Sequence, residues 1–121
     1  MKYKKLASLE KDVRKDYVKR VIFHTDELPG EGHMVQEVTI PPETRQRAHY
    51  HRRQTEIFFI LEGESDIHID GRRISAGPGD AFVCSPGEEH FVHNRSRNPF
   101  RLLVMKIERP GDSEDSVWTE D

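Results

Sequence analysis

The chain of 121 residues has little cysteine, no excess of basic residues and no long hydrophobic run. Its 19 lysines and arginines are outnumbered by 22 acidic residues, so no broad positive field is available to bind nucleic acid. No stretch approaches the roughly 18 consecutive apolar residues of a membrane span, and no apolar segment follows the lysine-rich start as in a signal peptide. Cys84 stands alone, which excludes an internal disulfide and predicts a cytoplasmic protein.

Hydrophobic residues are also scarce, at 34% of the chain, which is low for a globular protein. They are nevertheless concentrated in short runs, such as residues 57–61 and 102–105, whereas a disordered chain lacks such clusters. The length suits one domain with one core. We therefore expect a single folded domain whose polarity comes largely from its two ends.

Short runs rich in β-branched and aromatic residues alternate with turn residues, a pattern typical of an all-β sandwich or barrel. The expected strands are residues 17–24, 34–40, 47–51, 56–61, 65–69, 81–84, 90–94 and 100–108. Asp70 and Gly71 predict a type I′ hairpin turn, because both residue types tolerate positive φ angles. The chain then divides into a short N-terminal arm at 1–16, a barrel domain at 17–109 and an acidic tail at 110–121.

Four residues of metal-binding type stand out: His49, His51, Glu56 and His90. In an extended strand His49 and His51 point to the same face, so their imidazoles can converge on one ion. Glu56 joins them only if the chain turns after His51, and we expect His90 to reach the same point across a closed barrel. Three imidazoles and one carboxylate suit Fe, Mn, Ni, Co, Cu or Zn. In a chain with seven histidines a His-x-His pair also arises by chance, so the spacing alone leaves both readings open.

The wider pattern adds a resemblance. Residues 49–63 read H-x-H-x4-E-x6-G and residues 79–94 read G-D-x6-G-x2-H-x3-N, which resemble the two signature motifs of the cupin superfamily. The resemblance implies a jelly-roll barrel, also called a double-stranded β-helix, with a divalent transition metal held by His49, His51, Glu56 and His90. Two positions depart from the pattern, Glu43 where a glycine is expected and Ser85 where a proline is usual, and neither is a ligand.

Side chains alternate between the two faces of a strand, and this alternation (the strand parity) predicts which residues face the substrate. Gln36 and Arg47 share parity with inward-facing neighbours, although a surface position is equally open for Arg47. Phe58 and Ile60 are expected to line the barrel. A metal ion beside Arg47 would prefer small anions such as carboxylates. These residues are the expected substrate-binding set.

Two classes of function fit this site. The first is a metal-dependent enzyme, an oxygenase or an isomerase, that acts on a small oxygen-rich molecule. The second is a non-catalytic module in which metal and barrel hold a ligand, since fold resemblance alone does not choose between them. No acid or base beside the ligands can be placed from the sequence, which favours redox or Lewis-acid chemistry over acid–base isomerisation.

Several residues are expected to face away from the ion. His68 and His93 are expected on the outer face of their strands, and Cys84 is expected to be a small buried core residue. The run from 57 to 61 is apolar on both faces, so it presents Ile57, Phe59 and Leu61 outward, with Val21 and Phe23 adding to that surface. A monomer rarely exposes so much apolar surface, which predicts a homodimer.

Overall fold

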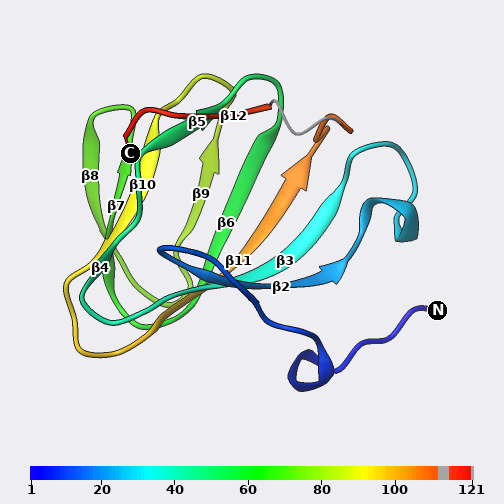
Figure 1. The fold of residues 1–121 in the computed structure, drawn as a ribbon, viewed down its shortest axis with the longest axis horizontal. Helices are drawn as coiled ribbons and strands as arrows, with labels where there is room; N and C mark the ends of the chain where they lie inside the picture. The colour runs from blue at the N-terminus through cyan, green and yellow to red at the C-terminus, as the bar shows by residue number, and fades with distance from the viewer. Residues whose placement is uncertain (112–114, 121) are drawn as a thin grey trace.

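The computed structural model describes residues 1–111 and 115–120, and its strands form two antiparallel sheets that face each other (Figure 1). The first sheet has the order β1 (Asp12–Val13), β2 (Val18–Phe23), β3 (Met34–Ile40), β11 (Phe100–Ile107), β6 (Thr55–Glu62) and β9 (Ala81–Cys84). The second has the order β12 (Ser116–Trp118), β5 (His49–His51), β10 (His90–Asn94), β7 (Ser65–Ile69) and β8 (Arg72–Ala76), with β4 (Thr44–Arg45) beside β10. The predicted all-β fold is confirmed.

The core lies between the two sheets and follows the alternation of the sequence. Along β6 the residues Glu56, Phe58 and Ile60 are buried, whereas Phe59 and Leu61 are 41% and 40% exposed. Ile67 from the second sheet is buried in the same hydrophobic core. Complete burial of one such side chain contributes roughly 1.5–3 kcal/mol, which makes this core the main stabilising contact between the sheets.

Two turns use backbone conformations that the sequence indicated. Asp70 and Gly71, between β7 and β8, have φ angles of 50° and 80°, so the predicted hairpin is confirmed. Glu43 has a φ of 54° at the position where the family pattern has a glycine. The turn therefore keeps the left-handed backbone of a glycine while carrying a side chain, which costs conformational energy but leaves the fold intact.

The eight expected strands are present with small changes at their ends, and four short strands add to them. β8 is the second strand of the predicted hairpin, whereas β1, β4 and β12 were not expected. The N-terminal arm holds only a 3₁₀ turn, η1 (Leu6–Ser8), and β1; a second turn, η2 (Thr25–Glu27), follows β2. No helix in the described ranges is long and apolar enough to span a membrane.

The acidic tail contributes to the fold. Its residues 112–114 and 121 lie outside the described residues, but β12 pairs with β5 along the edge of the second sheet, red beside green in Figure 1. Trp118 lies opposite His49 and Ser116 opposite His51 in this pairing. A strand at 116–118 was not read from the sequence, which shows no periodicity in the tail, because backbone pairing does not need an apolar pattern in so short a strand.

Candidate metal centre

Four ligand-type side chains meet between the sheets. β5 directs His49 and His51 to one face, and β10 places His90 directly opposite His49 in register. Glu56 comes from β6 in the other sheet. Each of the four offers a donor atom, these atoms all lie within 4.8 Å of one another, and all four residues are buried. His90 thus reaches the cluster from the strand next to β5 rather than across the barrel.

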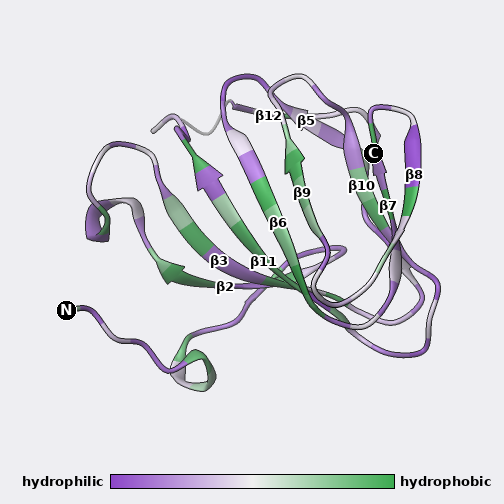
Figure 2. Ribbon diagram, turned by 180° about the vertical axis from the view of Figure 1, so that it is seen from behind, coloured by the Kyte–Doolittle hydropathy of each residue, from purple (hydrophilic) through white to green (hydrophobic). Residues whose placement is uncertain are grey.

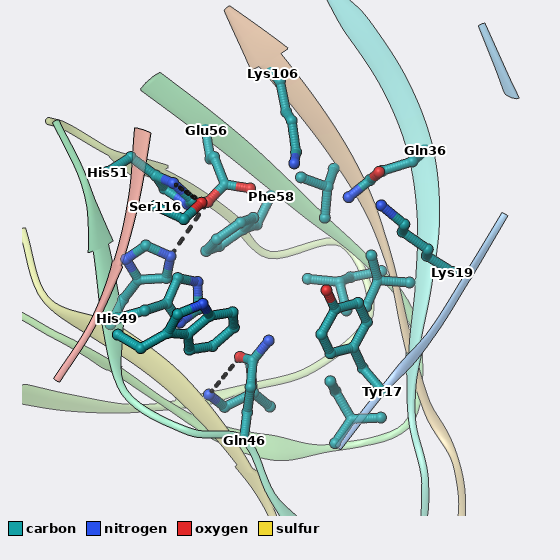
Figure 3. Close-up of a pocket in the computed structure, with 17 residues that line it drawn as sticks. Tyr17, Lys19, Gln36, Gln46, His49, His51, Glu56, Phe58, Lys106 and Ser116 are labelled. Carbon is teal, nitrogen blue, oxygen red and sulfur yellow. Dashed lines mark hydrogen bonds and ion pairs between the residues drawn. The ribbon is translucent and has the colours of Figure 1, made fainter. Parts of the chain in front are cut away.

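A tight turn brings Glu56 onto the same side as the histidines. The turn follows His51 and is held by Asp115, whose backbone carbonyl accepts from Arg52 N at 2.9 Å and whose carboxylate accepts from Gln54 N at 3.2 Å. Glu56 Oε1 then lies 2.5 Å from His51 Nε2 and 3.2 Å from His90 Nε2. Figure 3 shows His51 and Glu56 pointing toward each other at the edge of a cavity.

Hydrogen bonds on the outer side of each ring orient the imidazoles. His49 Nδ1 lies 3.0 Å from the carbonyl oxygen of Arg47, and His90 Nδ1 lies 2.9 Å from that of Glu88. Because a carbonyl oxygen only accepts, both rings carry their proton on Nδ1, and this leaves the Nε2 lone pair for a metal. His51 Nδ1 is 3.1 Å from Ser116 Oγ. The three rings therefore have the outer contacts of metal-binding histidines.

Electrostatics couple the four groups. Burial lowers the pKa of His49 to about 4, and the charge of His90 adds to this effect. Burial would raise the pKa of Glu56, but hydrogen bonds from His51 and His90 hold it well below its usual value. Burial would also lower the pKa of His90, but contacts with Cys84 and Glu56 outweigh it and raise this pKa to about 10. Without an ion, Glu56 is therefore a charged carboxylate, and His90 carries the proton that forms the hydrogen bond between them.

The residues fit a divalent transition metal. The donor set is three imidazole nitrogens and one carboxylate oxygen, all buried and converging, with Nε2 lone pairs available. Such a set binds Fe, Mn, Ni, Co, Cu or Zn, and it does not by itself select one of them. The predicted ligands His49, His51, Glu56 and His90 are therefore brought together as a possible metal site of unknown metal identity.

The cluster borders a cavity of about 90 Å³ between the sheets. Of the residues expected on its wall, Gln36 and Phe58 line it (Figure 3). Ile60 is 1% exposed and belongs to the core, outside the set of cavity-lining residues. Ile60 faces inward as predicted, but it lies two residues further along β6 from Glu56 than Phe58 does.

Arg47 does not line the cavity. Its Nε lies 3.2 Å from Oδ2 of Asp16, and its guanidinium carbon lies 4.1 Å above the ring of Trp118. β5 begins only at His49, so the strand parity used to point Arg47 inward does not extend to it. The predicted cavity position of Arg47 is corrected to a place behind Trp118, which itself lines the cavity and lies 4.7 Å from His49 between ring centroids.

Six polar or aromatic residues on the cavity wall were missed: Tyr17, Lys19, Gln46, Lys106, Ser116 and Trp118. A signal existed for Lys106, because it continues the inward alternation of Leu102 and Val104. Lysine and tyrosine at strand ends are usually solvated, which is why parity was not applied to them. No acid or base could be placed beside the ligands from the sequence, whereas the structure brings Tyr17, Lys19 and Lys106 to the same cavity.

The remaining polar side chains lie where parity placed them. His68 stacks on Phe91, with ring centroids 4.2 Å apart, on the outer face of the second sheet. His93 is partly buried between the buried residues Val92 and Asn94 of β10, which alternate with it. Cys84 is buried as expected, but its Sγ also lies 3.0 Å from His90 Nδ1. The thiol thus supports a metal-site histidine from behind.

Comparison with known proteins agrees with this geometry. Residues 36–106 match the family described as "Cupin domain". The chain belongs to the cupin family. L-ectoine synthase from Bordetella parapertussis is 30% identical over 106 residues, which are 84% of this chain and 77% of that protein.

Two further proteins are similar to this chain. The oxalate-binding protein of Thermotoga maritima is 29% identical over 68 residues, and the match spans 56% of each chain. The structure of the polyketide cyclase RemF from Streptomyces resistomycificus superposes with a TM-score of 0.79 at 23% identity, covering 95% of this chain and 89% of that one. The latter likeness shows the cupin fold, and neither relative defines the reaction of this chain.

Proposed function

We propose that this cupin is a metal-dependent enzyme that acts on a small, oxygen-rich anionic molecule bound in the cavity. The observation that carries the proposal is that the His49, His51, Glu56 and His90 cluster borders a cavity with other polar side chains on its wall. Structural metal sites are closed by their protein ligands, whereas catalytic sites keep a position open for water or substrate. Four donors on an ion that takes five or six leave such a position.

The chain's own residues would divide the work as follows. The cluster would hold the ion, which supplies Lewis-acid polarisation of a substrate oxygen. Burial raises the pKa of Tyr17, so its hydroxyl stays protonated and is available to donate a hydrogen bond or a proton to the bound molecule. Phe58 and Trp118 give the cavity apolar walls, and a low dielectric strengthens each polar contact made there.

The placement of Tyr17 favours proton-transfer chemistry of the isomerase type over oxygenation. Its hydroxyl points into the cavity on the side opposite His49 (Figure 3). Proton transfer by a positioned side chain accelerates a reaction by roughly 10²- to 10⁴-fold. The similarity to L-ectoine synthase supports a catalytic role, since that relative is by name an enzyme and its match covers most of both chains.

A deuterium-exchange screen tests the proposal. Protein loaded separately with each candidate metal is incubated in D₂O with a panel of small hydroxy and keto acids, and deuterium at carbon is followed by NMR beside an oxygen electrode. We expect exchange or isomerisation of one acid class, lowered at least about tenfold in Tyr17→Phe with metal content unchanged. Oxygen consumption without exchange would instead assign an oxygenase.

The second candidate is a non-catalytic binding module. The similarity to the oxalate-binding protein favours it, because that relative is by name a binder. Saturable binding of an acid to the loaded protein, with no exchange, isomerisation or oxygen uptake under any metal, is the result that would select this candidate.

We also propose that the protein is a homodimer. In Figure 2, β9 and part of β6 have the green of hydrophobic residues. Phe59, Leu61 and Val83 expose apolar side chains on the outer face of these strands, and Val83 is 60% exposed. Burial of such a face against a second copy would remove apolar surface that a monomer seldom exposes. Sedimentation at micromolar concentration is expected to give twice the 14.1 kDa of the chain, and Val83→Asp to give the single-chain mass.

A further inference from the structure

A second group of polar side chains lies across the cavity from the metal cluster. We call Lys19, Gln36 and Lys106 the lysine face; they come from β2, β3 and β11 of the first sheet. Figure 3 shows all three reaching into the cavity on the side opposite His49 and His51. No role in holding the ion accounts for them.

Strand register explains why the three side chains form one surface. Lys106 lies opposite Met34, two residues before Gln36 on β3, and Lys19 lies opposite Val38, two residues after it. Residues two apart on a strand share a face, so Gln36 stands between the two lysines on the inner surface of the sheet. Lys106 also lies opposite Glu56 in the backbone register of β11 and β6, so the lysine face begins on the strand next to the one that carries this ligand.

In the part of the chain that the structure describes, two groups on this face lack a partner, and the third has only a long ion pair. Gln36 is 5% exposed, and its Oε1 has no hydrogen-bond partner among the described residues. Lys106 forms no hydrogen bond or ion pair within the described part of the chain. For Lys19 the nearest carboxylate oxygen, on Asp12, is 4.0 Å away and already bonded by Arg14.

Such an arrangement costs free energy unless something binds there. A buried amide oxygen without a partner is rare, and two ammonium groups facing one cavity repel each other. Burial lowers the pKa of both Lys19 and Lys106, and the charge of Lys106 adds to the effect at Lys19. A divalent ion at the cluster would increase the positive charge further, because Glu56 supplies only one negative charge against it.

We propose that the lysine face binds one carboxylate of a small dicarboxylate while its other carboxylate binds the metal ion. The inference rests on the proposed function and names the substrate class for it. Lys106 and Lys19 would donate charge-assisted hydrogen bonds to the distal carboxylate, and the side-chain NH₂ of Gln36 would donate a further one. Two negative charges on one ligand match the two positively charged ends of the cavity.

The size of the cavity limits the length of this ligand. Its volume of about 90 Å³ holds roughly six to nine water-sized groups when about 10–15 Å³ is taken for each. Four-carbon dicarboxylates have about that number of non-hydrogen atoms. Succinate is therefore a suitable probe, with succinamate as a probe of the same length that carries one charge fewer.

The test is calorimetric titration of the Co²⁺-loaded protein with succinate, succinamate and acetate. We expect Lys106→Met to weaken succinate binding by about 10- to 100-fold, the range for loss of a hydrogen bond to a charged group. Lys19→Met should have a smaller effect, because its strand lies at greater distance from Glu56. Lys106→Arg keeps the positive charge and is expected to restore most of the affinity.

Matched controls separate this face from the protein's net charge and from the ion. Lys11→Met removes one positive charge from an exposed position and should leave all three affinities unchanged. Acetate reaches the ion alone, so its effect on the visible spectrum of Co²⁺ should be the same in the parent protein and in Lys106→Met. Circular dichroism and Co²⁺ content confirm that each variant is folded and loaded.

The outcomes are distinct. A loss confined to succinate in the Lys106 and Lys19 variants supports the lysine face. Equal affinity for succinate and succinamate, or no loss in a folded Lys106→Met, overturns the dicarboxylate subsite but leaves the proposed metal enzyme standing. Failure of the parent protein to bind Co²⁺ at the cluster refutes the proposed function itself.

Discussion

The two sides of the cavity differ in how their polar groups are satisfied. In the metal cluster every histidine has a contact on its outer nitrogen, from a carbonyl oxygen or from Ser116, so the rings are fixed before an ion binds. On the lysine face the amide oxygen of Gln36 and the ammonium of Lys106 have no partner among the described residues. Side chains with fixed orientations favour binding of an ion that requires a defined ligand geometry. Polar groups without partners favour reversible binding of a ligand that supplies the missing contacts.

The largest effect is expected from a substitution that disrupts only the metal cluster. His90→Ala removes one of four donors and leaves Glu56 with one partner fewer, so the affinity for Zn²⁺ should fall by more than about 100-fold. Competition with a chromophoric chelator measures this affinity.

His68→Ala is the matched control, because that ring lies on the outer face of the second sheet against Phe91. It should bind Zn²⁺ as the parent protein does, and Lys106→Met should show no loss of affinity, because it removes a positive charge and no ligand. A comparable loss in either of these variants would show that the two sides of the cavity are not separate.

Ser116→Ala tests the support behind the cluster. Its Oγ lies 3.1 Å from His51 Nδ1, and loss of such an outer contact lowers metal affinity by about 10- to 100-fold. The same chelator competition measures it. Thr119→Ala on the same segment, where only the backbone contacts Ala48, should have no effect; an unchanged affinity in Ser116→Ala would mean that His51 is oriented without the tail.

The pH dependence of metal binding sharpens the comparison further. In the ion-free cluster the pKa of His90 is raised to about 10, so His90 carries a proton near neutral pH that an incoming ion must displace. The pKa of His49 is lowered to about 4, so this ring binds without releasing a proton there. Between pH 7 and pH 9, affinity should therefore rise by about tenfold per pH unit as one proton is released.

Proton release measured by calorimetry in two buffers of different ionisation enthalpy checks this value. A flat affinity over the same range would mean that the ion-free cluster holds no displaceable proton. In that case the ion pair between His90 and Glu56 does not describe the protein in solution.

The smallest effect concerns Arg47, which belongs to neither side. Arg47→Ala removes the ion pair with the buried carboxylate of Asp16 and the contact with Trp118. We expect a loss of about 1–2 kcal/mol in the free energy of unfolding, since the guanidinium is partly exposed, with no change in carboxylate affinity. Urea unfolding measures the stability, Arg52→Ala is the exposed control, and weaker succinate binding would return Arg47 to the cavity.

The metal cluster could be predicted from the sequence because its geometry is mostly local. Two-residue spacing on one strand fixes His49 and His51, and a short turn fixes Glu56. His90 depends on a strand far along the chain, and it was found through a motif rather than through register. Its true neighbour is β5, a pairing that no local pattern reveals.

The lysine face and the tail could not be predicted in the same way. Lys19 and Lys106 have inward parity, but a lysine is solvated by default, and only the pairing of β2, β3 and β11 shows that both face a cavity. β12 has three residues and no alternation, so its place beside β5 follows from tertiary contacts alone. Arg47 was misplaced because parity was extended beyond the first residue of its strand.

X-ray absorption spectroscopy of the protein loaded with one equivalent of Zn²⁺ tests the central claim most directly. The spectrum should show scattering from three imidazole rings with Zn–N distances of about 2.0–2.1 Å, and one carboxylate oxygen at a similar distance. A Zn²⁺ environment with one imidazole or none, or the same spectrum from His90→Ala, would contradict an ion held by His49, His51, Glu56 and His90.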